Sequence, residues 1–127
     1  MRYMFLTSGA ETGAIPPQAM IDAIEEMTER EIAAGRMLAR GGLMPTAMGS
    51  ARMESRRGQL KLTDGPFAET KEVLGGFAIF EFATREEALA SLESFMQLHR
   101  QHWPEWEGFC EVRPMFGFGA TSAALAG

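Results

Sequence analysis

The chain has 127 residues, of which 46% are hydrophobic and 23% are charged, and its formal charge at pH 7 is −5. This length and composition fit one globular domain and exclude a mainly disordered chain. The acidic balance disfavours non-specific nucleic-acid binding, which needs clustered Lys and Arg. No apolar run approaches the roughly 20 residues that cross a bilayer.

Residues 2–8 predict a central β-strand, because large apolar side chains alternate onto both of its faces. These side chains are Tyr3, Met4, Phe5 and Leu6. A helix is predicted next, from Pro16-Pro17 to about Ala34, where Gly35 stops it. Its apolar stripe also contains Glu31, which we interpret as lying in a frayed last turn or, alternatively, as an acid of a cleft.

Three further segments predict strands. Residues 37–39 form a short strand that ends at Arg40-Gly41-Gly42. Residues 51–55 and 59–63 alternate apolar with polar side chains and predict a half-exposed hairpin. Residues 75–83 again carry apolar side chains on both faces, and the glycines at their start indicate a β-bulge or a close approach to a ligand.

Thr84 and Glu87 have the spacing of a capping box and predict a second helix, which Pro104 ends. A last strand is predicted over residues 109–115. The Gly/Ala-rich segment 117–127 has little to bury, so we predict a domain over residues 1–116 followed by a flexible tail.

This order of elements predicts an α+β fold, a ferredoxin-like sandwich with an extra β-hairpin and both helices on one face of the sheet. The two central strands are apolar on both faces, and two helices cover only one. We therefore expect a second copy of the chain to cover the other face, giving a homodimer.

The segment Leu62–Glu72 holds the densest special chemistry of the chain. In Asp64-Gly65-Pro66 an Asp side chain can bond its own backbone, a glycine can take positive φ, and a proline fixes φ. Asp64 is interpreted either as a general base or ligand acceptor at the rim of a cleft, or as a cap of the local turn.

The ten residues Thr63–Glu72, followed by Leu74-Gly75-Gly76-Phe77, closely resemble the signature of the DGPF-type branch of the YCII-related proteins. The resemblance extends over residues 1–116. It implies a dimeric α+β barrel. It also implies two roles: some relatives accompany alternative sigma factors, and a few are enzymes that act on small aromatic rings through a His/Asp pair. The histidine position of those enzymes falls at Ile24 here.

His99 is the candidate replacement proton carrier, on the apolar stripe of the second helix. Its alternatives are a packed histidine with one hydrogen bond, or a zinc ligand together with His102, which we do not favour. The segment 97–108, with Trp103 and Trp106, is expected either to close over the cleft or to extend a dimer contact.

Six further residues are candidate ligand contacts, each with a structural alternative. Phe67 lines the pocket or pins its loop, Glu69 contacts a ligand or belongs to a solvated surface run, and the two arginines neutralise an anion or form surface ion pairs. The set is Gly65, Pro66, Phe67, Glu69, Arg40 and Arg113. The basic cluster Arg52, Arg56, Arg57 and Lys61 is interpreted as charge that protects an exposed hairpin, or otherwise as a phosphate patch.

Neither a Gly-x-Gly-x-x-Gly element nor a phosphate loop is present, so no cofactor and no metal are predicted. The first residues, up to Leu6, are followed by no small-residue cleavage site, and the single cysteine, Cys110, fits a reducing compartment. We expect a cytoplasmic protein with an inert thiol. Its predicted function is binding of a small organic molecule, with or without cofactor-free acid/base chemistry; the alternative is an interaction module that regulates transcription through a sigma factor.

Overall fold

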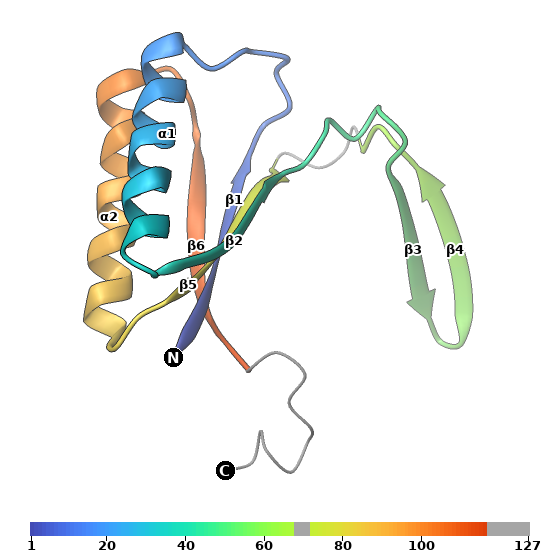
Figure 1. Ribbon diagram of the computed structural model, residues 1–127. Coiled ribbons are helices and arrows are strands. Elements are labelled where there is room, and N and C mark those ends of the chain that lie inside the picture. Colours follow the sequence, from blue (N-terminus) through green and yellow to red (C-terminus); the bar gives the residue numbers. More distant parts are fainter. Residues whose placement is uncertain (68–71, 117–127) are drawn as a thin grey trace.

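The computed structural model describes residues 1–67 and 72–116 (Figure 1). Its elements are β1 (Arg2–Gly9), α1 (Gln18–Ala33), β2 (Met37–Gly42), β3 (Ala51–Arg56), β4 (Gln59–Asp64), β5 (Val73–Glu81), α2 (Arg85–His102) and β6 (Gly108–Met115). Two of the predictions, the tail over 117–127 and the ligand contact Glu69, fall outside the described residues.

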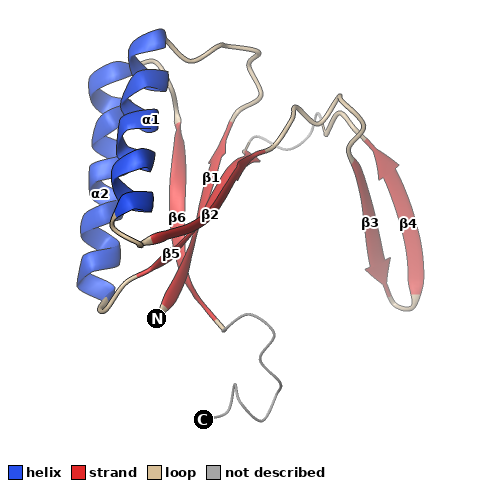
Figure 2. Cartoon of the chain, in the orientation of Figure 1, coloured by secondary structure: helices blue, strands red, loops and turns tan. Residues whose placement is uncertain are grey.

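Four strands form one antiparallel sheet in the order β2-β5-β1-β6, and α1 and α2 lie side by side against one of its faces (Figure 2). This arrangement confirms the predicted α+β, ferredoxin-like fold. The core lies between the sheet and the helices. It consists of Tyr3, Phe5, Met37, Phe80, Phe82 and Ala88. The rings of Phe5 and Phe80, from the two central strands, are 4.7 Å apart.

Local chemistry sets the helix ends. The Thr84 hydroxyl accepts a hydrogen bond from the Glu87 N–H at 3.2 Å, and the Glu87 carboxylate accepts one from the Ala83 N–H at 3.1 Å. The predicted capping box therefore forms, with one difference: the Glu87 carboxylate bonds the N–H of Ala83, one residue before the N-cap, and not the N–H of Thr84 itself. Helix α1 ends before Gly35, which has a φ of +74° and so suits the left-handed position after a helix.

The glycines at the start of β5 form the predicted bulge. Thr7 of β1 pairs with Gly76 and the next residue, Ser8, pairs with Leu74, so Gly75 is the extra residue. A side chain at Gly76 would press on the Gly41 carbonyl, at 3.3 Å from its Cβ. The bulge thus lies at the end of the sheet where β1 and β2 terminate.

The β3–β4 hairpin forms a separate two-stranded sheet and projects away from the body of the molecule (Figure 1). Eleven of its strand residues are exposed and only Thr63 is half-buried. The prediction that one face of this hairpin is buried was therefore wrong, because neither face is covered by the rest of the described chain.

Neither helix is long and apolar enough to span a membrane within the described part of the chain.

Glu31, for which the sequence left open a role as an acid of a cleft, forms a bidentate ion pair with Arg36 just beyond the end of α1. The two N–O distances are 2.6 and 3.2 Å. Its carboxylate stabilises the helix exit and is not part of a cleft.

Candidate functional site

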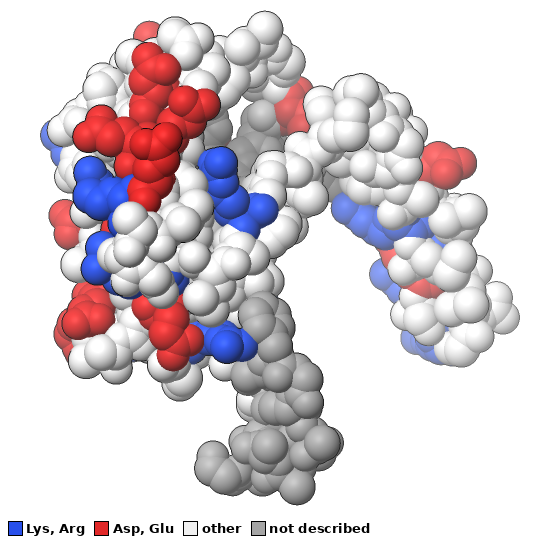
Figure 3. Space-filling model, viewed as in Figure 1, with Lys and Arg blue, Asp and Glu red and all other residues white. Residues whose placement is uncertain are grey.

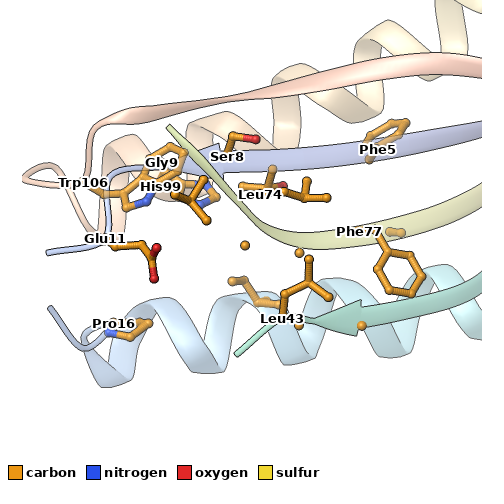
Figure 4. A pocket seen from close by; sticks show the side chains of 18 of the residues that line it. Phe5, Ser8, Gly9, Glu11, Pro16, Leu43, Leu74, Phe77, His99 and Trp106 are labelled. Atoms are coloured by element: carbon orange, nitrogen blue, oxygen red, sulfur yellow. The ribbon is translucent and has the colours of Figure 1, made fainter. Parts of the chain in front are cut away.

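A cavity of about 1290 Å³ opens between the sheet and the two helices, at the end where β1 and β2 stop and β5 begins (Figure 4). Sheet residues such as Phe5 and Phe80 form its floor, and Ile24 and Met27 of α1 form one wall. Phe95 and His99 of α2, with Trp106 beyond the helix, form the other. The lining is mainly apolar, so the few polar groups that reach it determine its chemistry.

His99 is the buried titratable group of this wall, with 7% of its surface exposed. Its Nδ1 lies 3.1 Å from the Phe95 carbonyl oxygen. A carbonyl only accepts, so Nδ1 carries the proton and Nε2 carries the lone pair. No described residue bonds Nε2, and no fully buried side-chain nitrogen or oxygen among the described residues lacks a partner. Nε2 is therefore not fully buried, and His99 lines both this cavity and a smaller pocket beside Trp103 and Glu107.

Burial lowers the pKa of His99 from its ordinary value of 6.5, and the hydrogen bond to the Phe95 carbonyl offsets this only in part. The imidazole is thus neutral at pH 7. A neutral ring with its proton fixed on Nδ1 has a basic Nε2 that can accept a proton or a hydrogen bond.

Two aromatic rings hold His99 in place. The centroid of Trp106 lies 4.4 Å from that of His99, and Phe95 meets the imidazole edge-on at 4.8 Å. Two glycines leave room for the indole, since a Cβ at Gly9 would lie 3.2 Å from its Nε1, and one at Gly108 would lie 2.5 Å from its ring. Trp103 and Trp106 both line the cavity, in agreement with the prediction that segment 97–108 closes over it; the predicted dimer contact of this segment stays a prediction.

Glu11 is a cavity residue that sequence reasoning missed. Its carboxylate points into the same end of the cavity as His99 (Figure 4). It accepts hydrogen bonds from the N–H of Thr46, at 2.8 Å, and from the Thr46 hydroxyl, which in turn accepts one from the Phe67 N–H at 3.2 Å. This chain of bonds connects three loops around the cavity. No sequence spacing signals it, because Glu11 and Thr46 are 35 positions apart.

The Gly65 position is set by close packing. A Cβ there would lie 1.9 Å from the Thr46 carbonyl oxygen, and the Gly65 N–H bonds the Ser50 carbonyl at 2.8 Å. Its φ is not positive, so the predicted reason for this glycine was wrong. Gly65 does not line the cavity itself, whereas the next two residues, Pro66 and Phe67, do.

Phe67 combines the two roles that the sequence left open. Its ring lines the cavity, and the Arg52 guanidinium lies over it at 4.3 Å. Arg40 also lines the cavity, and it forms no hydrogen bond or ion pair with any residue in the described ranges. Four of the predicted residues therefore meet at one cavity: Arg40, Pro66, Phe67 and His99.

Asp64 and Arg113 do not join them. Strand β4 extends through Asp64, whose side chain stands exposed on the hairpin face that also carries Leu62, and it lines no part of the cavity. The predicted pairing of Asp64 with His99 is thus absent within one chain. Arg113 pairs with Met4 in the sheet, on the face away from the helices, and forms an exposed ion pair with Glu111 at 3.8 Å.

Residues 1–96 match the model of the YCII-related domain. The chain belongs to the YCII-related family. The match covers three quarters of the chain and includes both the Asp64–Phe67 turn and most of α2. No curated protein matches the sequence.

Two further kinds of site concern this YCII-related chain: a reactive thiol and a metal centre. Burial raises the pKa of the Cys110 thiol above its ordinary value of 9.0, and the Thr7 hydroxyl lies 3.4 Å from its sulfur. The residue is therefore a protonated thiol, as its inert interpretation requires. Within the described ranges, no three His, Cys, Asp or Glu side chains gather in a way that could hold a metal ion.

Replacing Thr46 with Val keeps its shape but removes the hydroxyl that joins Glu11 to Phe67. We expect the free energy of unfolding to fall by about 1–3 kcal/mol, because the Phe67 N–H and the Glu11 carboxylate each lose a partner. Chemical denaturation measures this, with Thr63→Val on the hairpin as the matched control. Equal stability of Thr46→Val and Thr63→Val would contradict the role given to these bonds.

Stability should fall as the pH drops below 6.5, the ordinary pKa of histidine. The lowered pKa means that folded His99 resists protonation, so between the folded and the unfolded pKa the unfolded chain binds more protons. The stability that His99 contributes above pH 6.5 is therefore lost as the pH falls through the folded pKa. We expect the melting temperature of His99→Gln to fall less between about pH 7.5 and pH 5.5 than that of the wild type. His102→Gln is the control; a His99→Gln profile parallel to its profile would disprove the assignment.

Proposed function

We propose that this protein binds a small, mainly apolar organic molecule with a hydrogen-bond donor, in the cavity between its sheet and its helices. The observation that carries the proposal is a neutral, largely buried His99 that lines this cavity and whose Nε2 has no hydrogen-bond partner among the described residues. Nε2 is free to accept a hydrogen bond, so the site favours a ligand that donates one there.

The polar groups of the cavity, on His99, Arg40 and Glu11, have different roles. Nε2 accepts a proton or a hydrogen bond from the ligand. Arg40, without a described partner on the same lining, provides positive charge for an anionic group, including one that forms when the ligand loses a proton. Glu11 accepts two hydrogen bonds from Thr46 and therefore serves to hold the rim.

The same geometry supports cofactor-free acid/base chemistry. In this version His99 takes a proton from the ligand on Nε2, and the electron pair left behind either stays on the ligand as an anion near Arg40 or expels a leaving group. The role of base moves from Asp64 to His99, because only His99 lines the cavity.

We further propose that the protein acts as a cytoplasmic homodimer joined through its sheets. The helix-free face carries Met4, Leu6 and Phe77, three half-buried apolar side chains that a second sheet would cover. A protonated Cys110 without a disulfide partner agrees with a reducing compartment.

The second candidate function is an interaction module linked to transcription through a sigma factor. The specific observation in its favour is the projecting β3–β4 hairpin, whose Met53, Leu60 and Leu62 side chains are exposed. Exposed apolar surface of this kind is typical of protein contacts.

A thermal-shift screen with uncharged organic compounds that carry a hydroxyl or amide N–H tests the pocket. A ligand at about 100 times its Kd stabilises the native state by about 2.7 kcal/mol, so the melting temperature must rise. We expect His99→Gln to abolish the rise and Asp64→Asn, on the hairpin, to retain it. Circular dichroism checks that both variants fold.

Two results would contradict the proposal. One is a screen in which no compound raises the melting temperature of the wild type. The other is a rise that His99→Gln retains in full. Binding of a sigma factor that ignores both substitutions would instead favour the interaction module.

A further inference from the structure

The β3–β4 hairpin, residues 51–64, is an amphipathic arm. Directly paired residues share a face, and Met53 pairs with Leu62 while Ser55 pairs with Leu60. One face is therefore mainly apolar, and Leu60 on it is 70% exposed. The other face carries Arg52, Glu54, Arg56, Gln59, Lys61 and Thr63.

Nothing else in the described chain supports the apolar face of this arm. Strands β3 and β4 pair only with each other, and no helix or other strand packs extensively on them. A lone two-stranded hairpin is at best marginally stable in water. The arm therefore needs a surface to pack on.

The mouth of the cavity offers such a surface. Four large exposed hydrophobic residues line it: Ile15, Leu43, Met44 and Leu74. Ile15 is 83% exposed. The cavity volume of about 1290 Å³ also exceeds the roughly 300–1,000 Å³ of typical small-molecule sites, so a small ligand in contact with His99 leaves the mouth unfilled.

A second copy is the occupant that fits, because each chain carries both an uncovered arm and an uncovered mouth. The basic side chains of the arm lie mainly on the face opposite its apolar one, so charge attracts two copies at long range and makes no contact at the mouth. The arm holds Arg52, Arg56, Arg57 and Lys61 against Glu54 and Asp64, a net charge of +2, which leaves −7 for the rest of a chain whose total is −5. Acidic side chains gather on the exposed face of α1, which begins just after Ile15 (Figure 3). They are Asp22, Glu25, Glu26 and Glu29. The arm of the same chain points away from this region (Figure 1).

We propose that the arm of one copy covers the mouth of the cavity in the other copy, so that two chains complete each ligand site. The inference rests on the homodimer of the proposed function. The exchange is mutual, as a two-fold dimer requires. Each arm is about 20 Å long and about 10 Å wide, so two arms bury about 800 Å² in all, and the sheet faces must supply the rest of a stable interface.

Site-specific photo-crosslinking tests this arrangement. The photoreactive residue p-benzoylphenylalanine replaces Leu60 in one copy, which is co-expressed with an unmodified copy that carries a different affinity tag. We expect crosslinks between the two tagged chains, mapped by mass spectrometry to Ile15, Leu43, Met44 or Leu74. The same substitution at Lys61, on the opposite face of the same strand, should give several-fold fewer.

Light scattering separates the two proposals. A monomer overturns both the homodimer and the covered mouth. A dimer in which position 60 crosslinks to its own chain, to the other arm, to the Met4 and Leu6 face, or to nothing overturns the covered mouth alone. Crosslinks to the mouth support the inference whether or not the thermal-shift screen finds a ligand.

Discussion

Burial of one imidazole between two aromatic rings is the interaction on which the site depends. Phe95 and Trp106 remove His99 from water, and the Phe95 carbonyl fixes its proton on Nδ1. These two effects place a neutral imidazole at a defined position in the lining of the cavity. The indole can lie there only because Gly9 and Gly108 have no side chains, so the ends of β1 and β6 and the segment before β6 act as one unit with the histidine.

The rest of the fold places this unit at an opening. The antiparallel pairing of β1 with β5 buries Phe5 against Phe80 and supports both helices, while the bulge at Gly75 ends the regular pairing beside the cavity. Glu11, Thr46 and Phe67 then hold three loops together at the rim. The exposed apolar residues of the mouth and of the arm are left uncovered by the rest of the described chain.

Sequence reasoning succeeded where the signal is local or periodic. Alternation identified the central strands, Thr84 and Glu87 marked the start of α2, and the segment around Asp64-Gly65-Pro66 led to the family. It failed where the outcome depends on register or on distant contacts. The β1–β6 register puts Arg113 on the outer face, β4 carries Asp64 away from the cavity, and the approach of the Thr46 carbonyl explains Gly65. His99 was singled out from the sequence because it interrupts an apolar stripe.

Nitrogen-15 NMR of the imidazole tests the central claim most directly, since the chemical shifts of Nδ1 and Nε2 report both the tautomer and the pKa. The account predicts that His99 has its proton on Nδ1 and a pKa below 6.5, while an added ligand shifts the Nε2 resonance. A proton on Nε2 in the neutral ring, or a pKa at or above 6.5, would contradict it.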